Sequence, residues 1–294
     1  MNTNSNTYTI IYSTVLVVVV AAILAFAAEF LKPAQQKNIK VETISKVLTA
    51  ALQADENLSI ADDATDTDIM EMYAEHITDA YFIDAEGQKV GESMNLGKED
   101  INAIKVTTNS DLKAQNDLLK AGKTEGAKLP VYQFDINGQE ITVVPCYGAG
   151  LWGPIWGYVA VAADGKTIKG AIFDHKSETP GLGAKIAEEP FYSLFAGKEL
   201  DLNAAEKIFN VEKGHHTEAN IVDAISGATI TSQSLGRSLN RWFKAYKNFF
   251  NAMSASAAPE ECDECYMNYA EADEAAADCC KTEAEVENIT NKEE

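Results

Sequence analysis

The apolar pattern at the start of the chain predicts a membrane anchor. Residues 10–28 read IIYSTVLVVVVAAILAFAA, and no charged side chain precedes Glu29. These nineteen residues would span about 28 Å as a helix, close to the thickness of a bilayer's hydrocarbon core. A cleaved signal peptide is the competing interpretation, but a basic stretch is missing and the apolar run is long for one. We therefore expect a single uncleaved transmembrane helix within residues 1–30.

A second helical pattern follows the anchor. Pro33 is expected to end the first helix, because proline lacks an N–H and its ring clashes with the preceding turn. Over residues 41–52, apolar side chains then recur at helical spacing, which predicts a separate amphipathic helix beside the membrane. Its apolar face is formed by Ile44, Val47, Leu48, Ala51 and Leu52.

Runs of β-branched and aromatic residues predict a sheet in the middle of the chain. The expected strands are residues 80–83, 131–134, 141–147, 155–163 and 166–173. Asn137-Gly138 favours a tight hairpin between the second and third of these strands, and Asp164-Gly165 favours a turn between the last two. The polar, Lys-rich residues 98–123 predict a helix between the first two strands.

The clearest helical pattern lies near the end of the chain. Its apolar residues fall on one stripe, as expected for a helix that packs on a core. They are Leu235, Leu239, Trp242, Phe243, Tyr246, Phe249 and Phe250. Thr231 or Ser232 is expected to cap the start of this helix. Hairpins with interspersed helices indicate an α+β fold, a mixed or antiparallel sheet with packed helices, preceded by the transmembrane helix.

Composition and charge narrow the class of partner. The 294 residues are 46% hydrophobic, enough to bury one substantial core or two small ones. The net charge is −21, and residues 259–294 hold thirteen acidic side chains against two lysines, so −11 of that charge lies in this tail. An acidic chain repels phosphate backbones, which argues against nucleic acid as a partner. The tail shows no apolar periodicity, and we expect it to be disordered.

A hydroxyl-rich turn stands directly before the last helix. Residues 223–231 read DAISGATIT. A glycine-containing turn that leads into a helix presents unpaired N–H groups and the positive end of the helix dipole, which together suit a phosphate. Ser226, Thr229 and Thr231 add hydroxyl donors. The alternative is an ordinary capped helix start without a ligand.

Two glycine-rich segments are candidates for the same site. Residues 148–157 read GAGLWGPIWG and place two indoles among residues that let the backbone approach a flat ligand. Residues 178–183 read ETPGLG and predict a rigid turn with exposed amides. Either segment alone is also consistent with a plain loop or part of the core.

In this order, the three segments resemble the FMN-binding domain of the C subunit of the sodium-pumping NADH:quinone reductase and of the G subunit of the related Rnf complex. The resemblance extends over residues 141–242, and every specified position of the motif Asp-x-x-Ser-Gly-Ala-Thr-x-Thr is present. It implies FMN joined through its phosphate to the Thr229 hydroxyl by a separate flavin transferase that uses FAD. The other flavin-binding residues that it implies are Asp223, Ser226, Gly227, Ala228 and Thr231 of the motif and Trp152, Thr179, Gly181 and Leu182 around the ring.

The resemblance also implies a role and a location. We expect an electron-transfer subunit of the sodium-pumping enzyme, with iron–sulfur and flavin subunits as partners and quinone as the final acceptor. Length favours this family over the Rnf subunit, because residues 112–129 make the chain longer than is expected for the Rnf subunit. A non-redox, membrane-tethered binding protein is the alternative from a different class.

The expected membrane is the bacterial inner membrane. The resemblance implies that the soluble body lies on its periplasmic side. The three lysines that follow the span favour the cytoplasm instead by the positive-inside rule, but one short segment is a weak signal. They are Lys32, Lys37 and Lys40.

No acid, base or metal ligand is assigned to the chain itself, because the flavin would carry the redox chemistry. The chain is expected to lack a Gly-x-Gly-x-x-Gly fingerprint after a strand and so not to oxidise NADH alone. The predicted division is an anchor in residues 1–30, an α+β region in 31–130, the FMN-binding domain in 131–253 and the acidic tail in 254–294.

Other reactive side chains receive no role. Cys146 is interpreted as a buried apolar residue, and His215-His216 as part of a solvated loop. Four further cysteines could ligate a metal, but we favour free thiols or disulfides because no scaffold is apparent around them. These are Cys262, Cys265, Cys279 and Cys280.

Overall fold

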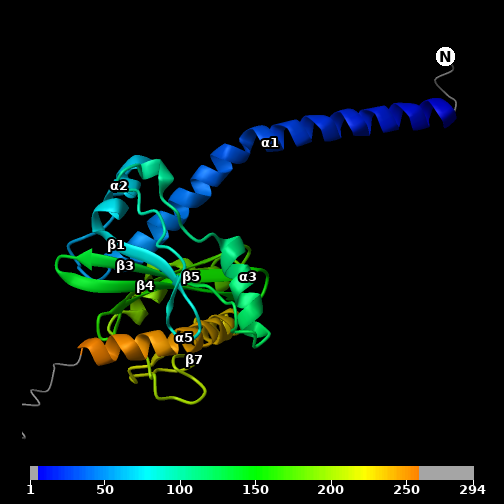
Figure 1. Ribbon diagram of the computed structural model, residues 1–294. Helices are drawn as coiled ribbons and strands as arrows, with labels where there is room; N and C mark the ends of the chain where they lie inside the picture. The colour runs from blue at the N-terminus through cyan, green and yellow to red at the C-terminus, as the bar shows by residue number, and fades with distance from the viewer. Residues whose placement is uncertain (1–5, 258–294) are drawn as a thin grey trace, which may run out of the picture. The chain divides into compact units, whose positions relative to one another are not determined.

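The strands expected between residues 80 and 173 form one antiparallel sheet in the computed structural model, which describes residues 6–257 (Figure 1). Its strands lie in the order β2-β1-β3-β4-β5-β6. They are β1 (Ile77–Ile83), β2 (Lys89–Val90), β3 (Leu129–Ile136), β4 (Gln139–Ala149), β5 (Pro154–Ala162) and β6 (Ile168–His175). Between β3 and β4, Asn137 has φ 52° and Gly138 has φ 82°, as in a type I′ hairpin turn. The expected strands and the α+β class are confirmed.

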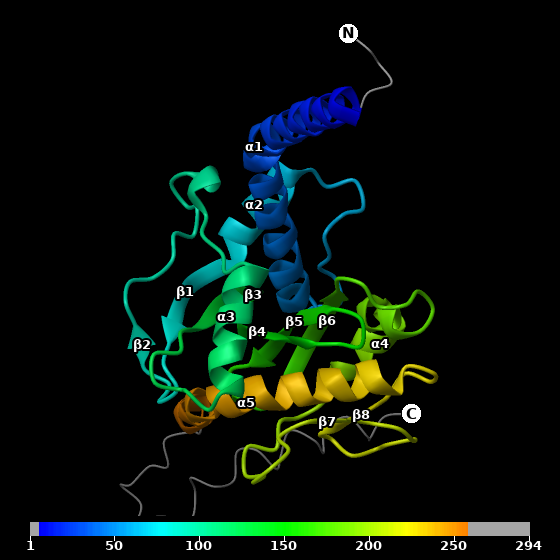
Figure 2. The same cartoon turned by 90° about the vertical axis from the view of Figure 1, so that its right-hand side faces the viewer.

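Both faces of the sheet are apolar, because successive side chains of a strand point to opposite faces. On β4, Val144 and Cys146 belong to one core, whereas Ile141 and Val143 belong to the other. The first core is covered by α5 (Thr229–Ala257). The second is covered by the last turns of α1 (Asn6–Leu52) and by α2 (Asp66–His76), as Figure 2 shows. The sheet therefore lies between two helical layers.

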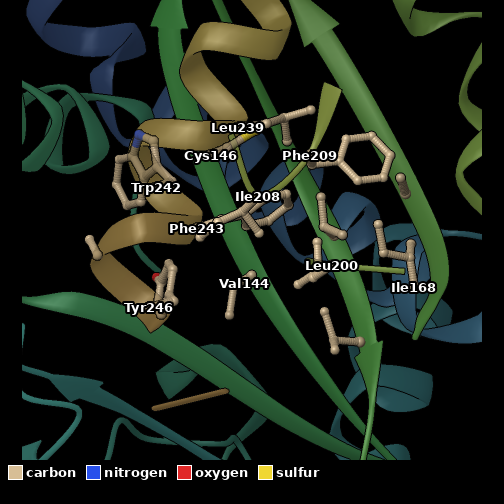
Figure 3. Packing of buried hydrophobic residues seen from close by; sticks show 14 of the residues in the cluster. Val144, Cys146, Ile168, Leu200, Ile208, Phe209, Leu239, Trp242, Phe243 and Tyr246 are labelled. Carbon is tan, nitrogen blue, oxygen red and sulfur yellow. The ribbon is translucent and has the colours of Figure 1, made fainter. Parts of the chain in front are cut away.

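The final helix carries the predicted apolar stripe, and all seven of its expected residues are buried. Two of them also bond to the sheet. Trp242 Nε1 donates to the Tyr147 carbonyl at 2.9 Å, and the Tyr246 hydroxyl donates to the Pro130 carbonyl at 2.7 Å. Figure 3 shows these side chains packed around Val144 of β4. The position of α5 on the sheet is thus fixed by polar contacts as well as by apolar area.

The anchor continues through Pro33, so the prediction that Pro33 ends the first helix was wrong. Residues 31–39 are all exposed, and the Glu29 carbonyl that loses its partner can be hydrated there. The helix is held beyond this point by its buried face from Val41 to Leu52, which confirms the predicted apolar residues of that segment. Every large apolar side chain from Ile10 to Leu31 is exposed, as expected for a helix surrounded by lipid.

The predicted helix over residues 98–123 is only partly present. It consists of a 3₁₀ turn, η1 (Ile101–Ala103), and of α3 (Asn109–Lys120), with extended backbone between them. Ile104 is buried in the core and the Thr107 N–H donates to the Tyr132 hydroxyl at 2.9 Å, which holds the intervening residues against the sheet. Tertiary contacts therefore override the helical composition here.

Short elements fill the connection from β6 to α5. They are η2 (Gly183–Ala187), α4 (Glu189–Tyr192), η3 (Ser193–Phe195) and a parallel pair of strands, β7 (Asn210–Glu212) and β8 (Ile221–Asp223). His215-His216 lies in the loop between β7 and β8, as expected. The acidic tail and its four cysteines lie outside the described residues, and the domain division stays a prediction.

Cys146 provides a test of the core packing. The thiol is buried and free, and burial raises its pKa to about 12. Because the thiolate is the reactive form, iodoacetamide at pH 8 should leave Cys146 unmodified in the folded protein and alkylate it in urea. Mass spectrometry of the tryptic peptides measures this directly. Rapid alkylation of Cys146 without denaturant would contradict the packing of β4 under α5.

Candidate functional site

The hydroxyl-rich motif forms the junction between β8 and α5. Ser226 and Gly227 make the turn, in which Gly227 has φ +80°, a conformation that favours glycine. The helix begins at Thr229, whose side chain is exposed. Its first hydrogen bond runs from the Ser232 N–H to the Ala228 carbonyl at 3.0 Å. The N–H groups of the three residues before Ser232 therefore have no helical acceptor, which is the property that suits an anion.

Thr231 and Ser232 do not cap α5, contrary to the prediction, because the helix begins before them. Ser232 Oγ instead accepts the Ile225 N–H at 3.1 Å and holds the turn against the helix. Thr231 donates its hydroxyl to Glu178 Oε2 at 2.6 Å. Both hydroxyl side chains are buried, so their hydrogen bonds shape the motif from inside.

Glu178 is a buried carboxylate that joins the three candidate segments, with 4% of its surface exposed. Its Oε1 accepts a hydrogen bond from the backbone N–H of Trp152 at 2.9 Å, while its Oε2 accepts one from the Thr231 hydroxyl. A hydrogen bond to each oxygen offsets part of the cost of removing the charge from water. The residue pattern did not predict this role, because the partners of Glu178 are 26 and 53 positions away in the sequence.

Two glycines provide the space that the carboxylate occupies. A Cβ added to Gly150 would lie 2.5 Å from Oε1 of Glu178, and one added to Gly183 would lie 2.5 Å from Oε2. A side chain at either position would displace the carboxylate from its donors. Gly150 and Gly183 thus leave the space in which the Glu178 carboxylate lies.

Four large apolar side chains stand exposed on the joined segments, and one of them, Leu151, is 46% exposed. Trp152 is 66% exposed, Leu182 is 43% exposed and Ile230 is 53% exposed. Leu182 lies against the motif, since its Cδ2 would be 3.1 Å from a Cβ on Gly227. Apolar side chains that remain exposed together mark a surface for a ligand or a partner.

The turn over residues 178–183 holds its predicted contact residues in place. The Thr179 carbonyl accepts the N–H groups of Leu182 and Ala184, both at 3.1 Å. Gly181 has φ +73°, which the turn requires. The side chain of Thr179 is exposed on the same turn as Leu182.

Residues 148–153, GAGLWG, carry the Gly-x-Gly-x-x-Gly spacing after a strand, contrary to the expectation that the chain lacks it. They join β4 to β5 rather than a strand to a helix. No helix start follows to receive a pyrophosphate, so the segment is not a dinucleotide fingerprint. Of its two indoles, only Trp152 belongs to the site. The Trp156 ring lies beside α1, with Lys46 Nζ 5.4 Å from the ring centroid.

Thr229 lines a cationic groove of about 760 Å³ between α5 and β7. The groove has five basic side chains, Lys207, Lys213, Arg237, Arg241 and Lys244, and two acidic ones, Glu206 and Glu212. This surplus of positive charge stands out in a chain whose net charge is −21. Desolvation, followed by the positive charge of Arg237, lowers the pKa of Arg241. The groove is therefore suited to an anion beside Thr229.

Asp223 fixes the entry to the motif. One carboxylate oxygen lies 2.9 Å from His215 Nδ1, and the other accepts the His216 N–H at 2.9 Å. The hydrogen bond from His215 is the main reason that the pKa of Asp223 lies below its usual value. Asp223 thus ties the β7–β8 loop to the start of the motif, and its side chain is committed to these contacts.

The arrangement offers an acceptor for a covalent bond rather than a proton-transfer pair. Within residues 6–257, no carboxylate or imidazole is hydrogen-bonded to the exposed Thr229 hydroxyl. The free N–H groups and the cationic groove suit a phosphate, and the exposed apolar side chains suit a flat aromatic ring. A phosphate ester that carries such a ring therefore fits these residues. In the same part of the chain, no cluster of His, Cys, Asp or Glu is arranged to hold a metal ion.

Comparison with known proteins identifies relatives of nearly the same extent. A family model described as an FMN-binding domain matches residues 150–244. The chain is 30% identical over 265 residues to the C subunit of the Na(+)-translocating NADH-quinone reductase of Neisseria meningitidis, covering 84% of this chain and 96% of that protein. Its counterpart in Haemophilus ducreyi is 32% identical over 246 residues, covering 82% and 91%. The crystal structure of the C subunit from Parabacteroides distasonis has a TM-score of 0.59 and 30% identity, over 75% of this chain and 96% of that chain.

Glu178→Ala tests whether this carboxylate holds the site together. The substitution leaves the Trp152 N–H and the Thr231 hydroxyl without their partner, and we expect it to lower the free energy of unfolding by about 1–3 kcal/mol. Urea denaturation measures the change. The matched control is Glu92→Ala, which removes an exposed carboxylate and should change stability by less than about 0.5 kcal/mol. Equal stabilities of the two variants would contradict the role of Glu178.

Proposed function

The chain belongs to the family of the C subunit of the Na(+)-translocating NADH-quinone reductase, and we propose that it relays electrons through an FMN esterified to Thr229. The chain is a flavoprotein subunit of that membrane complex. The observation that carries the proposal is the position of Thr229. Its exposed hydroxyl lies at the start of α5, where free N–H groups, a cationic groove and exposed apolar side chains meet.

The attachment step follows from the chemistry of the hydroxyl. Thr229 Oγ1 would attack the FMN-side phosphorus of FAD, so that a new P–O bond forms, the pyrophosphate bond breaks and AMP departs with the electron pair. Because no base of residues 6–257 is bonded to this hydroxyl, we infer that the flavin transferase accepts its proton. Neighbouring Ala228 and Ile230 have no oxygen with which to form the bond.

The chain's own residues would bind and orient the cofactor. Arg237 and Lys213 offset the charge of the phosphodiester, and the amides at the start of α5 can donate to its oxygens. Trp152, Thr179 and Leu182 are the contacts proposed for the ring. When bound, FMN supplies the redox chemistry, accepting and donating electrons. An exposed site leaves the cofactor accessible to other subunits.

The proposed relay receives electrons from an iron–sulfur centre of the complex and passes them to another flavin subunit on the way to quinone. GAGLWG joins two strands rather than a strand and a helix, which supports a relay rather than NADH oxidation by this chain. We assign the flavin-binding domain to residues 131–253, and the family match to residues 150–244 falls within it.

The chain is a single-pass protein of the inner membrane, in keeping with its one long apolar helix among the described residues. We propose that the body lies on the periplasmic side, where the transferase would reach the motif. The family resemblance supports this orientation. Lys32, Lys37 and Lys40 favour the opposite one, but they flank only one span.

Covalent attachment predicts a fluorescent band in a denaturing gel. Full-length protein made with the transferase should show this band, and Thr229→Ala should abolish it. The substitution alters an exposed residue and should change stability by less than about 1 kcal/mol, so unfolding would not explain the loss. Thr229→Ser, which keeps a hydroxyl, is the matched control and should retain label.

Peptide mass spectrometry then decides the attachment residue. Label on Thr231 or Ser226 in the unaltered protein would show that Thr229 is the wrong acceptor. A colourless protein from cells that contain the transferase would favour the non-redox binding protein instead.

Trp152 tests the proposed position of the ring. An indole stacked beside the flavin quenches its fluorescence, so Trp152→Ala should leave the covalent flavin content unchanged and raise its emission. Trp156→Phe is the matched control, because Trp156 lies beside α1, and it should leave the emission unchanged. Emission that is the same in the Trp152 variant and the unaltered protein would place the ring elsewhere.

A further inference from the structure

A cavity of about 1080 Å³ lies on the face of the molecule opposite α5. It is bounded by the part of α1 that follows the membrane span, by β1 and β5 of the sheet, and by the extended residues that precede α3. Figure 2 shows this part of α1 running down beside the sheet and α3. The volume is slightly above the usual range for small-molecule sites, which is about 300–1,000 Å³.

The wall of the cavity is mostly apolar. Its apolar side chains are Ile39, Phe82, Met94, Ile104, Val106, Trp156 and Tyr158. Thr107 is also part of the lining, but only 4% of it is exposed, and its N–H donates to the Tyr132 hydroxyl at 2.9 Å. A mostly apolar wall of this kind suits a hydrocarbon chain.

Basic side chains outnumber acidic ones in the lining of the cavity. Four lysines line the cavity, Lys40, Lys46, Lys105 and Lys176, against two carboxylates, Glu42 and Asp111. Lys46 pairs with Glu42 and with Asp174, and Lys40 donates to the Asn102 carbonyl. Lys105 and Lys176 are exposed and form no ion pair among residues 6–257. These two ammonium groups are available to an anion.

The cavity also lies close to the bilayer. Gln36, the first residue of α1 that lines it, follows the end of the apolar segment by eight residues of uninterrupted helix. Eight residues rise about 12 Å, only a few ångströms beyond the head-group layer, and helix tilt would bring the opening nearer. An apolar pocket with basic side chains in its lining at this height matches one component of the membrane.

We propose that the cavity binds an anionic phospholipid of the surrounding membrane, with one acyl chain against the apolar wall. Lys105 and Lys176 would hold the phosphate. Bound in this way, the lipid fixes the body relative to the membrane surface. The inference rests on α1 as the membrane span and does not depend on a flavin at Thr229.

Photolabelling tests the proposal on the full-length, flavinylated chain. The protein is placed in phosphatidylcholine nanodiscs that contain phosphatidylglycerol with a diazirine in its acyl chain, illuminated, digested and mapped by mass spectrometry. We expect label on the peptides of Met94 and Val106, in addition to label on the membrane span. Label confined to the membrane span would overturn the proposal.

Charge reversal separates a bound lipid from incidental contact. The double variant Lys105→Glu/Lys176→Glu should reduce cavity label by about tenfold or more, since each lysine near anionic lipid contributes about a factor of five. The control Lys120→Glu/Lys123→Glu changes two exposed lysines beyond the cavity and should keep the label. Circular dichroism of the same samples reports that each variant is folded.

Filling the cavity gives a second, independent variant. Val106→Trp should exclude the acyl chain and lower the label while the circular dichroism spectrum is retained. Unchanged label in both this variant and the charge-reversed variant would overturn the proposal. Crosslinks from Lys105 to another subunit of the assembled complex, without lipid label, would also overturn the proposal, because a protein segment would then occupy the cavity.

Discussion

Glu178 places a buried carboxylate where two donors from distant segments converge, the Trp152 N–H and the Thr231 hydroxyl. Removing a charge from water is costly unless its oxygens are hydrogen-bonded, so the carboxylate is stable there only when both segments are in place. The positions of the exposed side chains Trp152, Leu182 and Ile230 therefore depend on these two hydrogen bonds to Glu178. The buried carboxylate thus fixes the three segments relative to one another, although the side chains proposed to contact the ligand are exposed.

The helix α5 connects this site to the fold. One side of it packs Trp242 and Tyr246 on the sheet and bonds both to backbone carbonyls, whereas another side carries Thr229 and Arg237 along the cationic groove. Because α-helices place residues three and four apart on one face, a single helix serves both purposes without conflict. The start of α5 can therefore present free N–H groups rigidly, since the following turns are fixed by core packing.

Local patterns predicted most of the fold and the position of the motif. Runs of β-branched and aromatic residues predicted the strands, Asn137-Gly138 predicted the hairpin, and the stripe from Leu235 to Phe250 predicted the last helix. The errors arose where distant contacts decide the conformation. Pro33 lies within α1 because buried turns follow it, and Thr107 is extended because its N–H donates to Tyr132.

The candidate site was predictable only in part for the same reason. The motif and its flanking glycines are visible as residue types, and so are the exposed Trp152 and Leu182. The role of Glu178 depends on which donors the fold brings close to it, and residue spacing along the sequence does not indicate those donors. The cationic groove did leave a signal, since Gln233, Arg237, Asn240, Arg241 and Lys244 recur at helical spacing on α5. That signal gains meaning only when β7 supplies the opposite wall.

The uninterrupted course of α1 has a mechanical consequence. A continuous helix transmits torque, so the azimuth of the soluble body about the membrane normal is coupled to the face that the span presents to its neighbours in the bilayer. One residue inserted among positions 31–38 would rotate the body by about 100° and raise it by about 1.5 Å. Seven inserted residues would nearly restore the azimuth but raise the body by roughly 10 Å. Helical phase, more than linker length, thus sets the direction in which Thr229 faces.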